Sequence, residues 1–470
     1  MRWGKEEPGN QMTSPKPFAA VILAAGKGTR MKSDLHKVLH PIAGRPMLEH
    51  VLAAVSGIGP ERLVVVVGSG RDQLERLVGA YGGTIVVQEP QLGTGHAVLQ
   101  AAPPLAGFDG DVLILYADTP LVEAATMERM LARLHEPDRP AMVVLASRPD
   151  DPLAYGRVIA EADGTIRKMV EYKDATDEER ACTLCNSGVM AVRAGDLFAL
   201  LGEVGNDNAA REYYLPDIVM LAAARGKSAM VVETAAVEVA GVNSRGELAA
   251  LEAEWQARRR AEAMSDGVTL IAPETVWFAY DTMIGRDTIV APYVVFGPGT
   301  TIGAGVRIHA FSHIEGAEVA DGAELGPYAR LRPGAEIGAK AKIGNFVEVK
   351  KARFGAGAKA NHLSYIGDAE VGAGANIGAG TITCNYDGFF KYVTKIGEGA
   401  FVGSNSALVA PVAIGSGAVI GAGSVVTADV AADALVVARG DPVVKPGWAQ
   451  RFRARMSAKK ALKSVDGKTD

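Results

Sequence analysis

After about residue 266 the chain repeats an aliphatic residue at every sixth position. The three series are Ile284, Val290, Phe296, Ile302, Ile308, Ile314; Leu325, Leu331, Ile337, Ile343, Val349; and Ile396, Val402, Leu408, Ile414, Ile420, Val426. Many of them are followed directly by glycine, which allows a tight corner. A period of six is neither helical nor a strand alternation, and it is typical of a parallel β-helix. We therefore expect stacked coils that share one continuous core.

The six-residue phase is interrupted at two places that both carry polar residues. The first interruption lies between Phe354 and Ile366 and contains the segment 361–365, Asn-His-Leu-Ser-Tyr. The second lies between Ile377 and Ile396 and contains the segment 383–388, Thr-Cys-Asn-Tyr-Asp-Gly. Loops that leave a solenoid often carry binding residues. We expect both segments to be such loops.

The first 266 residues follow a different pattern, in which apolar runs alternate with helical periodicity. The expected strands are 18–23, 63–67, 85–87, 112–115 and 142–145, and the expected helices are 46–55, 72–80 and 124–134. This alternation predicts a doubly wound α/β domain with a largely parallel sheet, whose ligands sit at the carboxyl ends of the strands. The segment 244–264 predicts one long connecting helix with Leu248, Leu251 and Trp255 on one side.

Composition excludes several classes of protein. Lys and Arg number 49 against 54 Asp and Glu, and aromatic residues are 6% of the chain, so we expect no nucleic-acid partner. The three cysteines cannot form a disulfide framework and suit a reducing compartment. Cys182 and Cys185 have no nearby further cysteine, so we expect no zinc there, since a structural zinc needs four ligands.

No apolar run reaches the length of about 18 residues that a membrane span needs, so we expect no membrane partner. Residues 1–16 lack the apolar region of a targeting signal. We expect a cytoplasmic protein with a disordered leader at 1–17. The tail at 446–470 is rich in basic residues, and we expect it to be solvated and partly helical, although contact with coenzyme A phosphates or another subunit is an alternative.

The first apolar run ends in a glycine-rich loop at residues 26–28, with Arg30 and Lys37 following. Small residues let backbone N–H groups approach a phosphate, and the two cations can neutralise it. Glycines alone also occur in many ordinary turns. The loop lacks both the Walker A pattern and the full GxGxxG, which disfavours an ATPase or a hydride-transfer enzyme.

Longer strings are more specific. The segment 23–31 (LAAGKGTRM), the following Lys37-Val38-Leu39 and the segment 44–47 (GRPM) resemble the signature of sugar-1-phosphate nucleotidyltransferases. The segment 91–97 (QLGTGHA) resembles the base-recognition loop of that family. These strings are followed in the same chain by a hexapeptide β-helix. With both parts together, residues 19–448 resemble bifunctional enzymes that acetylate glucosamine-1-phosphate and then transfer a uridylyl group to the product.

The resemblance implies a division of the α/β chain into a Rossmann-like nucleotidyltransferase domain, a linker helix and a left-handed parallel β-helix. The implied boundaries are 18–243 for the uridylyltransferase, 244–266 for the linker and 267–445 for the acetyltransferase. The implied substrates are UTP, N-acetylglucosamine-1-phosphate, acetyl-CoA and glucosamine-1-phosphate, with Mg²⁺ as cofactor. Acyltransferases of this type resemble one another in forming homotrimers, which implies a site between coils.

Residue by residue, the resemblance implies a nucleotide site and a neighbouring sugar site. The nucleotide contacts would be Leu23, Ala24, Ala25, Gly26, Lys37, Gln88, Gly93 and Thr94, and the sugar contacts Gly156, Glu171 and Asn186. Arg30 and Lys37 would stabilise charge on the triphosphate. Asp118, just after an expected strand, would bind Mg²⁺ together with the distant Asn243, since a hard carboxylate suits that ion.

Two positions depart from the pattern of the family. His36 stands where proline is usual, and Ala117-Asp118-Thr119 replaces the commoner Gly-Asp-Val. The methyl group of Ala117 would lie near the substrate, and we expect it to be tolerated.

The acetyl acceptor is an amine that is mostly protonated at neutral pH, so its transfer needs a general base, for which histidine is well matched. His362 lies in the segment 359–368, which resembles the acetyltransferase signature with Asn361 and Ser364 in place of Gly and Thr. Glu348 is a candidate to orient His362. Implied acceptor contacts are Arg332, Lys350, Tyr365, Asn376 and Lys391; implied acetyl-CoA contacts are Ala379, Asn385, Tyr386, Ser404, Ala422 and Arg439. The Ala379 N–H is a candidate for the thioester oxyanion.

Two other classes of function remain open from the sequence. One is a single nucleotidyltransferase whose β-helix only oligomerises or regulates it, which would have no use for His362, Arg332 and Lys350. The other is a non-catalytic assembly subunit, which would have no use for Asp118 and Asn243. The presence of all of these residues together favours the bifunctional enzyme.

Overall fold

A computed structural model describes residues 16–466 except 27, 69, 153–154 and 441, and side chains up to residue 458. Residues 1–15 of the expected leader therefore lie outside the described part. The chain divides into two compact units. Unit 1 comprises residues 1–266 with 276–282 and 296–298, and unit 2 comprises the remaining segments from 267 onward. Within the described residues, no helix combines the length and apolar character needed to cross a membrane.

Unit 1 is built on a nine-stranded sheet with the main order β11-β7-β10-β6-β1-β4-β5. The bounds of these strands are β1 Phe18–Ala24, β4 Arg62–Val67, β5 Thr84–Val87, β6 Asp111–Tyr116, β7 Met142–Ser147, β10 Cys185–Arg193 and β11 Ala229–Thr234. Strands β8 (Arg157–Ala160) and β9 (Ile166–Val170) extend the sheet beside β10. The pairs β1–β4, β1–β6, β4–β5 and β7–β11 are parallel, whereas β10 runs antiparallel to β6 and β7. The expected, largely parallel sheet is confirmed.

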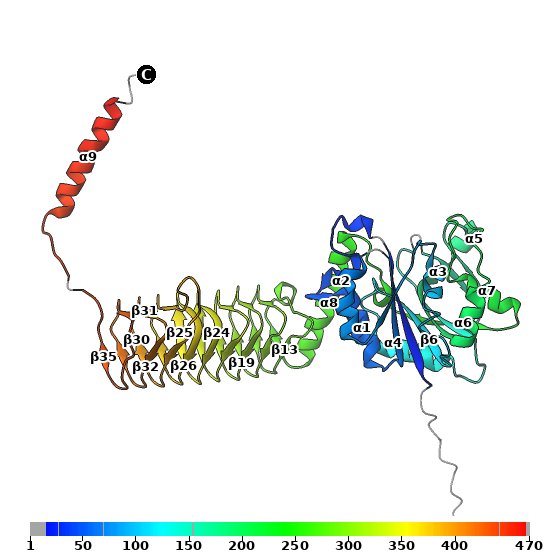
Figure 1. The fold of residues 1–470 in the computed structure, drawn as a ribbon, viewed down its shortest axis with the longest axis horizontal. Coiled ribbons are helices and arrows are strands. Elements are labelled where there is room, and N and C mark those ends of the chain that lie inside the picture. Colours follow the sequence, from blue (N-terminus) through cyan, green and yellow to red (C-terminus); the bar gives the residue numbers. More distant parts are fainter. Residues whose placement is uncertain (1–15, 27, 69, 153–154, 441, 467–470) are drawn as a thin grey trace, which may run out of the picture. The chain divides into compact units, whose positions relative to one another are not determined.

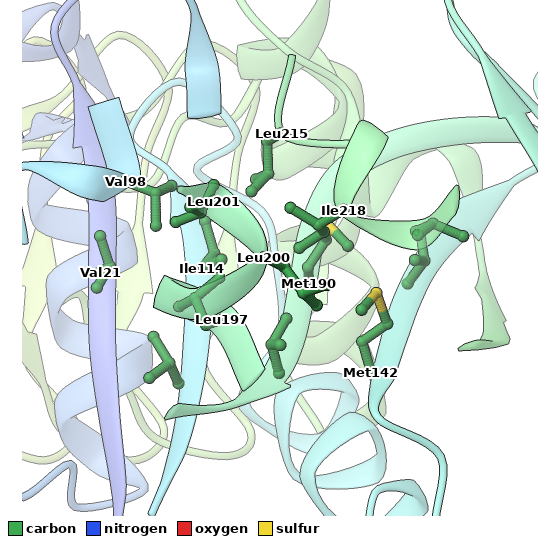
Figure 2. Packing of buried hydrophobic residues seen from close by; sticks show 14 of the residues in the cluster. Val21, Val98, Ile114, Met142, Met190, Leu197, Leu200, Leu201, Leu215 and Ile218 are labelled. Carbon is green, nitrogen blue, oxygen red and sulfur yellow. The ribbon is translucent and has the colours of Figure 1, made fainter. Parts of the chain in front are cut away.

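Helices cover both faces of this sheet (Figure 1). Their bounds are α1 Met47–Gly57, α2 Arg71–Ala80, α3 Thr94–Leu99, α4 Ala124–Arg133, α5 Asp177–Arg180, α6 Ala194–Leu201, α7 Asp217–Ala224 and α8 Arg245–Ser265. Alternate residues of β1 enter different cores because strand side chains alternate between faces. Val21 packs in the core with α3, α6 and α7, as Figure 2 shows, whereas Ile22 packs in the core with α1, α2 and α4.

The long helix α8 begins at a reciprocal cap. The Ser244 hydroxyl accepts a hydrogen bond from the Glu247 N–H at 3.3 Å, and the Glu247 carboxylate accepts one from the Ser244 N–H at 2.8 Å. Such a capping box satisfies N–H groups that the first turn would leave unpaired. Leu251 is buried in a small core that includes Leu248 and Trp255. The predicted helix and its apolar side are therefore confirmed.

Unit 2 is a parallel β-helix of short strands that pair in register with those of the next coil (Figure 1). One face comprises β12 Thr269–Leu270, β14 Ile289–Val290, β17 Arg307–Ile308, β20 Glu324–Leu325, β23 Lys342–Asn345, β25 Lys359–His362, β27 Asn376–Ile377, β30 Phe401–Val402, β33 Val419–Ile420 and β35 Leu435–Val436. The residues of the six-residue series point inward and are mostly buried. The predicted stacked core is confirmed.

The remaining strands of unit 2 form one further sheet that branches along the coils. They are β13 Met283–Ile284, β15 Val295–Phe296, β16 Thr301–Ile302, β18 His313–Ile314, β19 Ala317–Val319, β21 Arg330–Leu331, β22 Ala335–Ile337, β24 Glu348–Phe354, β26 Tyr365–Val371, β28 Ile382–Cys384, β29 Thr394–Ile396, β31 Ala407–Val409, β32 Val412–Ile414 and β34 Val425–Val426. The basic tail forms α9, Trp448–Asp466.

Of the two predicted loops, the one between Phe354 and Ile366 is wrong and the one between Ile377 and Ile396 is confirmed. The segment between Phe354 and Ile366 keeps its phase, because Ala360 occupies the inward position, is fully buried and pairs with Ile343 and Ile377. An alanine fills the prism there, and its small side chain hides the six-residue period in the sequence. The segment 385–393 does leave the coils, and Tyr386 pairs with Lys391 across the resulting hairpin.

Candidate active sites

A cavity of about 390 Å³ lies in unit 1 where β1 and β6 end. Ten residues expected at the nucleotide and metal site line it: Leu23, Ala24, Ala25, Gly26, Lys37, Gln88, Gly93, Thr94, Asp118 and Asn243. Arg30 lies in a 3₁₀ turn (Thr29–Met31), is exposed and does not belong to this lining. The carboxyl edge of parallel strands is thus where these side chains gather.

The ammonium group of Lys37 is the central cation of this cavity. Its Nζ donates to Asp118 Oδ2 at 2.5 Å and to Asn243 Oδ1 at 2.7 Å. The two acceptors come from loops 125 residues apart in sequence, and the Val242 N–H donates to the Asp118 carbonyl at 3.0 Å, which ties these loops together. The Asn243 N–H in turn donates to the Glu247 carboxylate at 2.6 Å. The start of α8 therefore helps to fix this cluster.

The oxygens of Asp118 and Asn243 fit a divalent cation. Both converge on one point, since a single nitrogen lies within 2.7 Å of each. One carboxylate and one carboxamide oxygen are hard ligands, and Mg²⁺ commonly uses one or two protein oxygens together with waters and substrate phosphate. These two residues would hold that ion.

Two glycines make room for the polar groups. Gly28 has a left-handed backbone (φ 59°), and a Cβ there would lie 2.6 Å from the Cβ of Lys37. Gly93 has φ 113°, and a Cβ there would lie 2.6 Å from the Tyr213 carbonyl oxygen. Both positions require glycine, because L-residues with side chains rarely adopt such conformations and the space is already filled.

The expected base-recognition loop is held from two sides. The buried Gln88 amide donates to the Gly93 carbonyl at 2.9 Å, and Gln91 Nε2 donates to the Ala25 carbonyl at 2.5 Å. The Leu215 N–H donates to Thr94 Oγ1 at 3.0 Å from a distant segment. The Gln91 contact joins this loop directly to the glycine-rich loop.

The three residues expected to contact the sugar form a second cluster outside that lining. The Asn186 N–H donates to the Gly156 carbonyl at 2.9 Å, and a Cβ on Gly156 would lie 3.3 Å from Glu171 Oε1. Burial, with help from the nearby Asp217, raises the pKa of Glu171. Tyr116 lines the nucleotide cavity, and burial raises the pKa of its phenol, with contributions from Asp118 and Glu171. Tyr116 thus connects the two clusters electrostatically.

Sequence reasoning missed three polar residues of the cavity lining: Gln91, Tyr116 and Glu212. Gln91 is the first residue of the segment 91–97, and Tyr116 stands just before Ala117 and Asp118. Glu212 lies more than a hundred residues from the loop it faces, and its neighbour Tyr213 bonds to Leu92. No local pattern signals that contact.

In unit 2 the expected acetyl-transfer residues follow one corner of the β-helix. Backbone hydrogen bonds connect this corner from coil to coil: Leu363 N to Asn345 O, Gly380 N to His362 O, Asn405 N to Ala379 O and Gly423 N to Ser404 O, while the Arg439 guanidinium donates to Ala422 O. His362, Ala379, Ser404 and Ala422 therefore occupy equivalent positions of successive coils. A single elongated ligand that lies along this corner could contact all of them.

The partner of His362 is a residue that sequence reasoning did not select. His362 Nδ1 lies 2.5 Å from Asn345 Oδ1, and the two residues are paired in register between β23 and β25. Glu348 pairs with arginines, since it accepts a hydrogen bond from Arg332 at 2.7 Å and lies near Arg330. Its role toward His362 stays a prediction. Glu348 begins the strand after the corner, where arginines of the preceding coil face it.

Cations and a carboxylate gather beside this corner. Lys350 Nζ lies 3.7 Å from Asp368 Oδ2, which also accepts a hydrogen bond from the Asn385 amide. The adjacent Lys350 lowers the pKa of Lys391, because two ammonium groups repel each other. Tyr365 is half-buried on the neighbouring strand, with Gly367 against its ring. The two lysines therefore bring two positive charges close together at this place.

Two other predicted residues of unit 2 lie apart from these bonds. Asn376 is half-buried in β27, in register between Lys359 and Phe401. Tyr386 is exposed on the extruded hairpin and donates to the Gly388 carbonyl at 2.5 Å.

Comparisons with known proteins find matches in both units of the chain. Residues 20–177 match the family of MobA-like NTP transferase domains, and residues 281–316 and 394–428 match the bacterial transferase hexapeptide (six repeats). The chain is 72% identical over 448 residues to the bifunctional protein GlmU of Rhizorhabdus wittichii, covering 95% of this chain and 99% of that one. It is 65% identical to the Sphingopyxis alaskensis GlmU and 64% identical to that of Novosphingobium aromaticivorans, covering 95% of this chain and 98% and 99% of theirs.

Proposed function

Because the chain belongs to the family of bifunctional GlmU proteins and is both an acetyltransferase and a uridylyltransferase, we propose an assignment of the two reactions to its two units. Unit 2 transfers acetyl from acetyl-CoA to glucosamine-1-phosphate. Unit 1 then transfers a uridylyl group from UTP to N-acetylglucosamine-1-phosphate. The observation that carries this assignment is the gathering of two separate sets of residues, around Lys37 in unit 1 and around His362 in unit 2.

In uridylyl transfer, a phosphate oxygen of the sugar phosphate bonds to the α-phosphorus of UTP, and the bond from that phosphorus to the bridging oxygen breaks to release pyrophosphate. Both reactants are polyanions, so catalysis rests on alignment and charge neutralisation. Lys37 and Arg30 supply positive charge. Asp118 and Asn243 would hold Mg²⁺, which would supply further positive charge to the phosphate groups. Gln88, Gly93 and Thr94 hold the base, with Leu23–Gly26 beside the phosphates.

In acetyl transfer, His362 Nε2 takes a proton from the amine of glucosamine-1-phosphate. The amine nitrogen bonds to the thioester carbon, and the carbon–sulfur bond breaks so that coenzyme A leaves as a thiol after taking up a proton. Arg332, Lys350 and Lys391 bind the acceptor phosphate, with Tyr365 and Asn376 beside the sugar. The Ala379 N–H stabilises the oxyanion, and Asn385, Tyr386, Ser404, Ala422 and Arg439 hold acetyl-CoA.

Each reaction should proceed without the substrates of the other. Wild-type protein with acetyl-CoA and glucosamine-1-phosphate should release thiol in the absence of UTP. With UTP, Mg²⁺ and N-acetylglucosamine-1-phosphate it should release pyrophosphate in the absence of acetyl-CoA. A folded protein that released pyrophosphate but no thiol would reduce unit 2 to a scaffold.

We assign Asn345 as the positioning residue of His362. Its carbonyl oxygen lies within 2.5 Å of Nδ1 and is suited to accept the Nδ1–H. That bond leaves Nε2 unprotonated and free to act as the base. Asn345→Ala should lower kcat for acetyl transfer about tenfold by loosening the ring.

Asn345→Asp separates this role from a structural one. A carboxylate beside the ring favours the protonated imidazolium, so the acid limb of the pH–rate profile for acetyl transfer should move to higher pH. Circular dichroism and a thermal unfolding transition like those of wild type report intact folding of the variant. An unchanged pH profile in a folded Asn345→Asp protein would refute the assignment.

We further propose a cytoplasmic homotrimer. The hexapeptide coil supports it, as does the extruded hairpin, whose Phe389 and Phe390 are 85% and 69% exposed in the single chain. A neighbouring coil would cover these rings and bring the hairpin beside its own substrate. Light scattering of the purified protein measures this state.

A further inference from the structure

Lys37 occupies the position at which the two proposed metal ligands converge. Its nitrogen is 2.5 Å from Asp118 Oδ2 and 2.7 Å from Asn243 Oδ1, and its side chain is 9% exposed. Mg²⁺ would bind the same oxygens at about 2.0–2.1 Å. An ammonium group and a divalent ion cannot both occupy a point shared by these two oxygens. One must leave when the other binds.

We propose that Lys37 is an internal competitor of the divalent cation, so that metal binds at Asp118 and Asn243 together with the nucleotide rather than before it. The inference rests on the proposed uridylyl transfer in one respect, which is that a triphosphate enters this cavity. Without nucleotide, the ammonium neutralises the carboxylate and keeps both oxygens in place. With nucleotide, the phosphates offer Lys37 another anionic partner.

The chemistry and surroundings of Lys37 suit such a movement. A lysine is a compact charge on a flexible four-carbon chain, unlike the planar fork of arginine. The stem of Lys37 passes Gly28, where a Cβ would lie 2.6 Å away, so the side chain runs directly along the glycine-rich loop. That loop also lines the cavity through Gly26. A small rotation of the side chain can therefore exchange carboxylate for phosphate.

The test measures Mn²⁺ binding to the full-length protein without any nucleotide, by the electron paramagnetic resonance signal of free Mn²⁺. Lys37→Met, which keeps the length and removes the charge, should bind Mn²⁺ at least about tenfold more tightly than wild type. Lys32→Met is the matched control, since Lys32 is exposed between the glycine-rich loop and Lys37, does not line the cavity, and should leave the affinity unchanged. Adding Asp118→Asn to Lys37→Met should abolish the gain and so locate the ion.

Equal or weaker Mn²⁺ binding by folded Lys37→Met would overturn the proposal, and so would an equal gain in Lys32→Met. Circular dichroism and a thermal unfolding transition like those of wild type report folding of each variant, and Lys37→Gln replaces Lys37→Met if the latter does not fold. Failure of the proposed function would instead appear as absent pyrophosphate release by wild type. The two failures are therefore distinguishable.

Discussion

His362→Ala protein should release thiol from acetyl-CoA with glucosamine-1-phosphate at least about 10²-fold more slowly than wild type, and its uridylyl transfer should be unchanged. The alanine removes the group that takes the proton from the amine, and general-base catalysis is commonly worth about 10²–10⁴ in rate. The side chain projects at an exposed corner of the β-helix, so its loss leaves the inward-facing Ala360 and Ile366 in place. Thiol release and pyrophosphate release, measured on one preparation, separate the two effects.

A second exposed histidine of the β-helix provides the control. His313 lies in β18 and is exposed, so His313→Ala should retain both reactions. Loss of pyrophosphate release in His362→Ala, matching its loss of thiol release, would contradict the division of the reactions between the units.

Asp118→Asn should lower kcat/KM for uridylyl transfer by about 10²–10³ while thiol release stays at the wild-type level. The substitution keeps the shape of the side chain but removes the negative charge that Lys37 contacts and that would hold Mg²⁺. Pyrophosphate release at several Mg²⁺ concentrations measures the effect, and raised Mg²⁺ should restore part of the rate.

Asp109→Asn serves as the matched control, because Asp109 is exposed shortly before β6 and has no place in the cavity lining. A nearly wild-type rate in Asp118→Asn would remove this carboxylate from the mechanism and from the proposed cation site.

Periodicity predicted the architecture because both units are built from regular patterns. The inward series of the β-helix is readable at Ile337 or Ile414, where a large aliphatic residue precedes glycine. It fails at Ala360, because an alanine carries little hydrophobic signal although it is completely buried. The same failure produced the mistaken loop at 354–366.

Contacts between distant segments limited the prediction of the sites. The glycine-rich loop and Asp118 are visible in local strings, and they do surround one cavity. Asn345 was not selected, because its proximity to His362 depends on the register of two coils 17 residues apart rather than on a motif. Glu212 likewise reaches the cavity through backbone pairing of Tyr213 with Leu92.

The cap of α8 bears on how this gene could be divided into separate enzymes. Asn243 is held through its N–H by Glu247, and Val242 is bonded to Asp118, so the first turn of the helix helps to fix both proposed metal ligands. A gene split at residue 243 would keep every motif residue of unit 1. It would, however, remove the Glu247 carboxylate that holds Asn243 in place. Because Leu251 also packs in a core of unit 1, we expect a working division of the gene to fall beyond α8, so that the helix stays with the uridylyltransferase.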